Sequence, residues 1–167
     1  MLVTETTGFE DFFRLQHPKL VALGMAMSGS REAGRDLAQE ALLRTYRNWP
    51  TVSRYDNPAA WVRRVLINLT TGARRRGASE RDALTRLAPS EPMLVPDRIA
   101  DDWWKVVLAL PERQRAAVAL HYLDDLTVTE VAGILGVTNG TIKASLSHAR
   151  AHLATALDAP HRTPEPR

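Results

Sequence analysis

The chain has 167 residues and a mass of 18.6 kDa, with 44% apolar residues, 25% charged residues and four tryptophans. This composition is typical of a globular protein with one domain or two small ones. The chain contains no cysteine, which excludes disulfides, thiol catalysis and cysteine-ligated zinc. The longest apolar run covers only residues 20–27, and the first residues are neither basic nor apolar. We therefore expect no membrane insertion, no signal peptide and a cytoplasmic location.

The net charge of +3 is unevenly distributed along the chain. Positive and negative groups balance over residues 1–57 and again over 103–158, whereas seven arginines between residues 58 and 87 face only Glu80 and Asp82. If that segment is helical, its cationic surface suits a phosphate backbone. A solvated helix face is the other interpretation, and it is the commoner one for an isolated run of charge.

Hydrophobic periodicity predicts an all-α fold, because no stretch alternates in the manner of a β-strand. Pro89, Pro92 and Pro96 stand in an acidic segment and indicate a linker over residues 78–100. We therefore expect two small helical domains, over residues 8–77 and 101–158, followed by a proline-rich, disordered tail over 159–167.

The first domain begins with apolar residues at helical spacing over 9–27, and Ser30 is expected to cap the helix that follows. In that second helix the apolar stripe runs from Leu37 to Trp49 and includes Tyr46. A leucine on an otherwise polar, outward face can indicate a partner surface, although single exposed leucines are common. This outward face carries Asp36, Gln39, Glu40, Leu43 and Arg47.

Asn57 and Pro58 predict the start of a further helix, with asparagine as cap and proline in the first turn. The loop before this helix carries Arg54 and Tyr55. A basic helix beside an aromatic loop suits single-stranded nucleic acid, since bases stack on a ring while arginines follow the phosphates; Tyr55 packing beneath its own loop is an equally good interpretation. The side of the helix expected to face solvent carries Arg63, Arg64, Asn68, Thr71, Arg74 and Arg75.

The second domain contains the most informative stretch of the sequence. Thr127 and Glu130 form the pattern of a capping box, and Gly136 is placed to end the short helix that they begin. The spacing of Ala132, Gly136 and Ile142 is that of a helix-turn-helix, although two packed helices joined by a glycine turn can show it by chance. The second helix, capped by Thr138, is of the kind that reads the major groove. Its outward residues are Asn139, Thr141, Lys143, Ala144, Ser147, His148, Arg150 and Ala151.

No motif in the sequence indicates an enzyme. His148 and His152 stand four residues apart, but neither a zinc-protease glutamate nor a third ligand is near them in sequence. A glycine-rich phosphate loop and a nucleophile elbow are also missing. We therefore expect no catalytic residue, no metal and no cofactor.

The order of these segments resembles a bacterial sigma-70 family factor of the extracytoplasmic function (ECF) group. Residues 36–46 (DLAQEALLRTY) look like region 2.2 of that family, and residues 57–68 (NPAAWVRRVLIN) with Arg74, Arg75 and Arg76 look like regions 2.3 and 2.4. Residues 110–115 (LPERQR) and the helix-turn-helix look like region 4. The resemblance covers about residues 8–157. It implies a sigma factor that binds bacterial core RNA polymerase and directs transcription initiation from promoters.

The resemblance also implies roles for particular residues. The outward face of the second helix would contact the polymerase β′ clamp helices, and the second domain would contact the β flap. Residues of the basic helix and its preceding loop would follow the melted −10 strand, and the recognition helix would read the −35 duplex. The polymerase contacts would be Asp36, Gln39, Glu40 and Leu43. The −10 contacts would be Arg54, Tyr55, Asn57, Arg63, Arg64, Asn68, Thr71, Arg74 and Arg75. The −35 contacts would be Asn139, Thr141, Lys143, Ser147, His148 and Arg150.

Three positions depart from the family pattern. Arg35 stands where many relatives have a carboxylate, Gly72 stands where an aspartate is common, and residues 143–145 (KAS) lack an arginine that relatives carry. The resemblance also suggests an anti-sigma partner. The alternatives are a stand-alone helix-turn-helix regulator and, from a different class, a nucleic-acid enzyme such as a recombinase fragment.

Overall fold

The structure is a computed structural model that describes residues 2–81 and 98–158, with side chains over 8–72 and 104–155. The described residues form eight α-helices and no strand, which confirms the all-α prediction for them. In chain order the helices are α1 (Leu2–Ser28), α2 (Arg31–Arg47), α3 (Trp49–Val52), α4 (Pro58–Arg81), α5 (Arg98–Ala109), α6 (Glu112–Tyr122), α7 (Val128–Leu135) and α8 (Asn139–Asp158). Most of the expected linker and the expected disordered tail lie outside the described residues.

Helix boundaries in the first half follow the predicted capping residues. Gly29, at φ 76°, ends α1, and the Ser30 hydroxyl accepts a hydrogen bond from the Ala33 amide at 3.3 Å to begin α2. The Asn57 side chain accepts a hydrogen bond from the Ala60 amide at 2.9 Å at the start of α4. These caps satisfy backbone groups that a helix end leaves without an internal partner. Both predicted caps are confirmed.

Helices α1 and α2 pack with their backbones almost in contact, at a pair of glycines. A Cβ atom built on Gly24 would lie 2.5 Å from the Gly34 carbonyl oxygen, and one built on Gly34 would lie 2.6 Å from the Met25 amide nitrogen. Only glycine fits at such distances, because any Cβ would push the two backbones apart. The antiparallel pair formed by α1 and α2 is therefore fixed by two residues without side chains.

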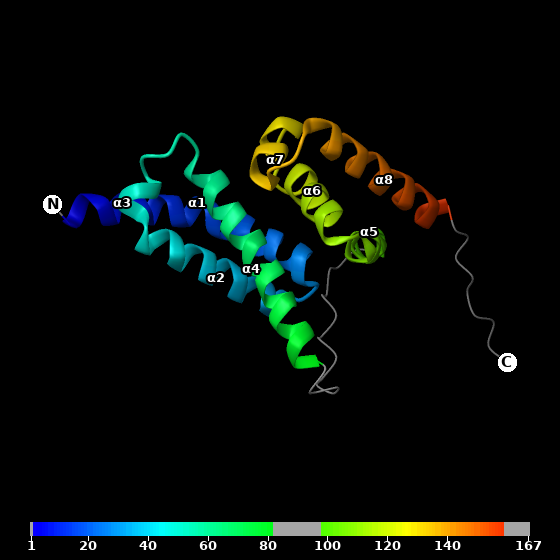
Figure 1. Cartoon of the computed structure of the whole chain (residues 1–167), viewed down its shortest axis with the longest axis horizontal. Coiled ribbons are helices and arrows are strands. Elements are labelled where there is room, and N and C mark those ends of the chain that lie inside the picture. Colours follow the sequence, from blue (N-terminus) through cyan, green and yellow to red (C-terminus); the bar gives the residue numbers. More distant parts are fainter. Residues whose placement is uncertain (1, 82–97, 159–167) are drawn as a thin grey trace.

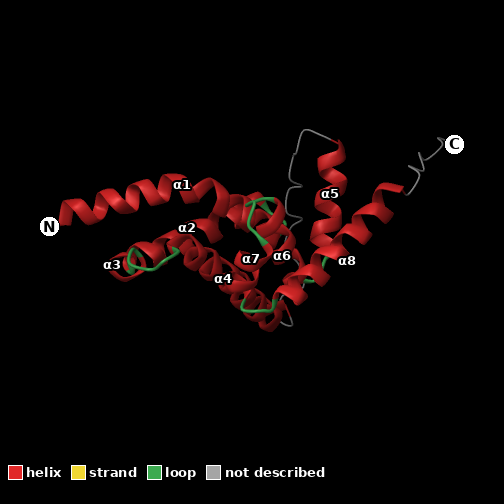
Figure 2. Ribbon diagram, turned by 90° about the horizontal axis from the view of Figure 1, so that it is seen from above, coloured by secondary structure: helices red, strands yellow, loops and turns green. Residues whose placement is uncertain are grey.

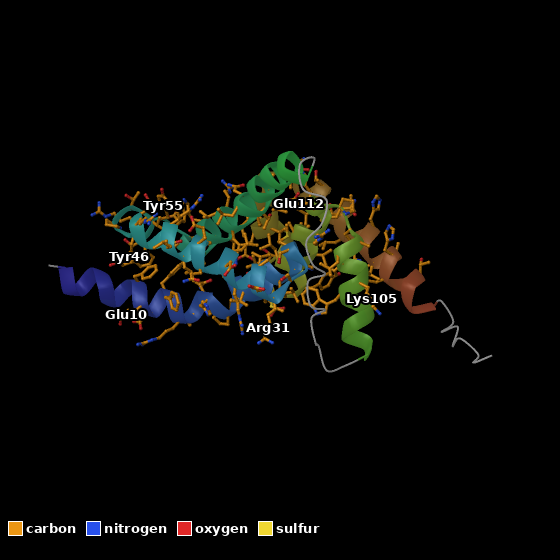
Figure 3. All side chains as sticks on the ribbon, turned by 90° about the horizontal axis from the view of Figure 1, so that it is seen from below. Glu10, Arg31, Tyr46, Tyr55, Lys105 and Glu112 are labelled. Atoms are coloured by element: carbon orange, nitrogen blue, oxygen red, sulfur yellow. The ribbon has the colours of Figure 1, made fainter. Side chains whose placement is uncertain are left out.

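One residue of the predicted apolar stripe of α2 lies elsewhere than expected. Ala38, Ala41 and Leu42 are buried, as predicted, but Tyr46 is 51% exposed. Its ring packs on that of Phe9 at a centroid distance of 5.0 Å, toward the end of the molecule where α1 extends beyond the other helices (Figure 3). The interpretation of Tyr46 as an inward residue was wrong, because Tyr46 lies at the edge of the buried stripe, next to Thr45, which is fully buried.

The two halves of the chain share one apolar core. Figures 1 and 2 show α1–α4 gathered on one side of the molecule and α5–α8 on the other, with α6 and α7 against α1 and α4. The buried residues Leu20, Leu66, Val107 and Leu120, from both halves, belong to a single cluster. The two expected domains, which remain a prediction, therefore pack directly on each other in this structure.

Arg115 of α6 is buried at this junction and caps two helices at once. Its guanidinium donates hydrogen bonds to the Met27 carbonyl at 3.1 Å, in the last turn of α1. It also donates to the carbonyls of Leu108 at 2.7 Å and Leu110 at 3.0 Å, at the end of α5 and just beyond it. The positive charge thus satisfies carbonyls that lack a partner within the helix, at the negative end of both helix dipoles.

Candidate nucleic-acid interface

The predicted helix-turn-helix is formed by α7 and α8. The Thr127 hydroxyl accepts from the Glu130 amide at 3.3 Å, and the Glu130 carboxylate accepts from the Thr127 amide at 2.8 Å, so the capping box is complete. Gly136 ends α7 at φ 66°, a backbone conformation that glycine adopts without strain. Ala132 and Ile142 are buried between the two helices. The Thr138 hydroxyl accepts from the amide of Thr141 at 3.2 Å and begins α8.

The recognition helix α8 turns its polar residues to solvent. Its inner side buries Ile142, Leu146 and Ala149, as predicted. The candidate −35 contacts are all exposed: Asn139, Thr141, Lys143, Ser147, His148 and Arg150. In the part of the chain that the structure describes, no group of three or more metal-ligating side chains is present, so His148 and His152 have no third partner there.

The candidate polymerase surface on α2 is also open to solvent. Asp36 and Gln39 are exposed, and Leu43 is 40% exposed. Glu40 accepts a hydrogen bond from Arg44 Nε at 2.7 Å, one turn further along the same helix. An exposed ion pair of this kind adds little to stability, so these residues remain available to a partner.

The aromatic loop between α3 and α4 lies at the exposed end of the first half. Arg54 and Asn57 are exposed, and Tyr55 is 44% exposed, so its ring does not pack beneath the loop. Figure 3 shows Tyr55 far from α5 and on the side of the molecule where α3 joins α4. This loop could therefore be approached by a nucleic-acid strand without any movement of the other helices.

The first arginine of α4 lies differently from the prediction, whereas the second is exposed, as expected, and is bonded to the second half of the chain. Arg63 is 3% exposed, and its Nε and Nη2 atoms donate to the two carboxylate oxygens of Asp124, the latter at 2.9 Å. Arg64 donates from Nε to the Ile134 carbonyl at 2.9 Å and from Nη2 to the Gly133 carbonyl, both in the last turn of α7. The predicted solvent-facing side of α4 is therefore wrong for Arg63, because the segment that joins α6 to α7 covers it.

The remaining α4 candidates lie along the same contact. The Thr71 hydroxyl donates to the Glu112 carboxylate of α6 at 2.8 Å, and Thr70 does so at 3.3 Å. Asn68 lines a cleft of about 380 Å³ between α4, α6 and α8, whose opposite wall includes Thr141. The structure thus brings candidate −10 and −35 residues to one cleft. The side chains of Arg74 and Arg75 lie outside the described residues.

The contacts that the second half makes with α4 were not predicted from the sequence. They involve Asp124, the carbonyl groups of α7 and Glu112, which the sequence indicated only as part of the 110–115 motif. The acidic pair at residues 124–125 between two leucines is a weak signal, since acidic residues are also frequent in solvated turns. Nothing local in the sequence links Asp124 to Arg63, which stands 61 residues before it.

Comparison with known proteins identifies both halves. Residues 12–80 match the family model for sigma-70 region 2, and residues 101–153 match that for sigma-70 region 4. The chain is 31% identical over 152 residues to the RNA polymerase sigma-E factor of Streptomyces coelicolor, covering 89% of this chain and 85% of that protein. It is 30% identical over 152 residues to the ECF RNA polymerase sigma factor SigM of Mycobacterium tuberculosis, covering 90% of this chain and 77% of that protein.

Two solved structures share the fold. The sigma factor RpoE from Bartonella quintana, in a complex with the anti-sigma factor NepR, matches with a TM-score of 0.75 and 24% identity, over 92% of this chain and 99% of the other. CnrH, in a complex with the cytosolic domain of CnrY, matches with a TM-score of 0.65 and 16% identity, over 93% of this chain and 90% of the other. The matched regions and relatives confirm the resemblance, and the chain belongs to the sigma-70 family as a promoter-recognising sigma factor of the ECF group.

Proposed function

We propose that the chain acts as a non-catalytic subunit that docks on bacterial core RNA polymerase through α2 and contacts promoter DNA through α4 and α8. The two family regions in order along one chain carry this proposal. In docking, the face of α2 formed by Asp36, Gln39, Glu40 and Leu43 would contact the β′ clamp helices of the polymerase, while region 4 would contact the β flap. No helix in the described parts of the chain is long and apolar enough to cross a membrane, and we propose a cytoplasmic location.

The exposed side of α8 supports its assignment to the −35 duplex. Lys143 and Arg150 lie on neighbouring parts of that exposed side and supply positive charge, while Asn139 and Ser147 can hydrogen-bond to base edges. The −10 strand would follow Arg54 and Tyr55 and then α4. We further propose an anti-sigma protein as a regulatory partner, since the two structural neighbours above were solved in complexes of which at least one contains a named anti-sigma factor.

The first experiment is transcription of a pool of genomic fragments by purified bacterial core polymerase, with and without this protein. We expect specific transcripts only when both components are present, and their start sites would supply the promoter sequence. Binding of the protein alone to duplex fragments, with no new transcripts, would instead favour the stand-alone helix-turn-helix regulator.

The docking surface is tested by reversing charge on α2. The variant Asp36→Lys/Glu40→Lys should bind core polymerase about tenfold or more weakly, because like charges across an interface are strongly unfavourable. The variant Glu10→Lys/Asp11→Lys, at two exposed acids of α1, makes the same change in net charge and should bind as the parent does. If the α2 variant bound core polymerase as tightly as the parent does, this face of α2 would not be the docking surface.

A further inference from the structure

The first residue of the recognition helix is bonded to the other helix of the motif. Asn139 begins α8, and its Nδ2 atom donates a hydrogen bond to the Thr129 hydroxyl of α7 at 3.2 Å. Both residues are exposed, so this bond lies on the outer surface of the helix-turn-helix. In such motifs the residues at the start of the second helix are those that contact base edges. Asn139 is therefore a candidate base contact whose side chain already has a partner in the free protein.

Thr129 is well placed to support the Asn139 side chain. It stands in the first turn of α7, between the two residues of the capping box. Its branched Cβ limits the directions in which the hydroxyl can point. The burial of Ala132 and Ile142 between α7 and α8 fixes how closely the two helices approach. The position of the hydroxyl relative to Asn139 is thus set by the motif itself.

The bond to Thr129 leaves the amide of Asn139 able to read a base. A side-chain amide has two N–H groups and a carbonyl oxygen, and Thr129 takes one N–H. Asparagine reads adenine by donating one N–H to N7 and accepting from the N6 amino group with its carbonyl oxygen. The groups that remain are sufficient for this contact. Without the bond, the side chain would have to become ordered when DNA binds, and that ordering weakens binding.

We propose that Thr129 is a positioning residue for promoter recognition, which holds Asn139 in the direction in which its amide reads an adenine–thymine pair of the −35 element. The proposal rests on the proposed role of α8 in −35 binding. In the free protein water competes for both exposed side chains, so the bond contributes little to folding. A duplex that covers this surface displaces part of that water, and the bond becomes stronger because the local dielectric constant falls.

A direct contact between Thr129 and DNA would give a different result. The first helix of such a motif crosses the DNA backbone, and a hydroxyl there can bond to a phosphate. Loss of a phosphate contact weakens binding to all sequences alike. Loss of positioning weakens binding only to sites that contain the base pair that Asn139 reads. Base preference therefore separates the two roles, whereas affinity for a single site does not.

The test compares three threonine variants. Thr129→Val removes the hydroxyl at nearly constant shape, Thr129→Ser retains it, and Thr155→Val makes the first change at an exposed position near the other end of α8. Heteronuclear NMR of the free protein follows the side-chain amide signals of Asn139, which are identified by their loss in Asn139→Ala. Transcription by core polymerase at limiting concentration is measured from the promoter that the genomic pool supplies, with each −35 base pair replaced in turn.

We expect Thr129→Val to shift the amide signals of Asn139. Transcription from the parent's preferred −35 sequence should fall by about 3- to 10-fold, because the side chain must then be ordered on binding. Promoters in which the adenine read by Asn139 is replaced should be transcribed equally by Thr129→Val and the parent. On every promoter, Thr129→Ser and Thr155→Val should behave as the parent does.

Unchanged amide signals of Asn139 in Thr129→Val would overturn the proposal without reference to DNA. An equal loss of transcription on all promoters would also overturn it, since that result would assign Thr129 to a phosphate contact. A preferred base other than adenine, at the pair to which Asn139→Ala becomes indifferent, would do the same. If the parent gave no specific transcripts, the proposed function itself would fail; if it gave them, each of these results would overturn the positioning role alone.

Discussion

The double cap formed by Arg115 gives a stability prediction that can be worked from its contacts. Replacement by methionine keeps an unbranched apolar stem but removes the guanidinium and its hydrogen bonds to the carbonyls of Met27, Leu108 and Leu110. Hydrogen bonds from a charged donor contribute roughly 1.5–3 kcal/mol each. Since the bonds to Met27 and Leu110 are buried while the Leu108 carbonyl can regain water, we expect a loss of about 3–5 kcal/mol.

That loss is a large share of the roughly 5–15 kcal/mol by which small proteins are stable. Urea unfolding followed by tryptophan fluorescence measures it, because Trp61 and Trp104 both pack against the shared core. The variant Arg113→Met alters an exposed arginine of the same helix and should change stability by less than about 0.5 kcal/mol. If the free energy of unfolding of Arg115→Met lay within about 1 kcal/mol of the parent's, the double cap would contribute little to stability and the reasoning would be refuted.

Two further predictions concern the close helix pair and the capping box. Gly24→Ala should destabilise the protein by about 1–3 kcal/mol, because its Cβ would lie 2.5 Å from the Gly34 carbonyl oxygen, whereas Gly133→Ala, with open space around its Cβ, should be neutral or stabilising in the same urea titration. Hydrogen bonds from the hydroxyl and then the amide of Thr127 lower the pKa of Glu130 below its ordinary value of 4.5. The stabilisation that the ionised Glu130 carboxylate gives the folded state is therefore present above pH 4.5 and is lost as pH falls through its lowered pKa in the folded state. The difference in unfolding free energy between the parent and Glu130→Gln should stay level near neutrality and shrink in acid; a difference that grows toward low pH would contradict the assignment.

Local features of the fold could be predicted because each depends on a few neighbouring residues. The caps at Ser30 and Asn57, the capping box and the turn at Gly136 all follow from spacings of three or four residues. The exposure of the polar residues of α8 could be predicted because residues three and four positions apart lie on the same face of a helix. These are the features that give region 4 its form, so the recognition helix was placed correctly from sequence.

Contacts between distant segments could not be predicted in the same way. Periodicity places Arg63 on the polar side of α4, but it does not show that a carboxylate 61 residues later covers that side. The glycine pair of α1 and α2 was missed for a related reason, since Gly24 and Gly34 interrupt no local pattern and become informative only when the two backbones meet. Tyr46 was placed inward because its spacing fits the stripe, but it lies at the edge of that stripe and is half exposed.

The buried pair of Arg63 and Asp124 restricts how this protein can change by mutation. Arg63 is 3% exposed, and its guanidinium donates to both carboxylate oxygens of Asp124. Loss of either side chain alone leaves the other charge covered and without this partner, which is strongly unfavourable. Substitutions at these two positions, 61 residues apart in the chain, are therefore expected to be tolerated together far more readily than one at a time.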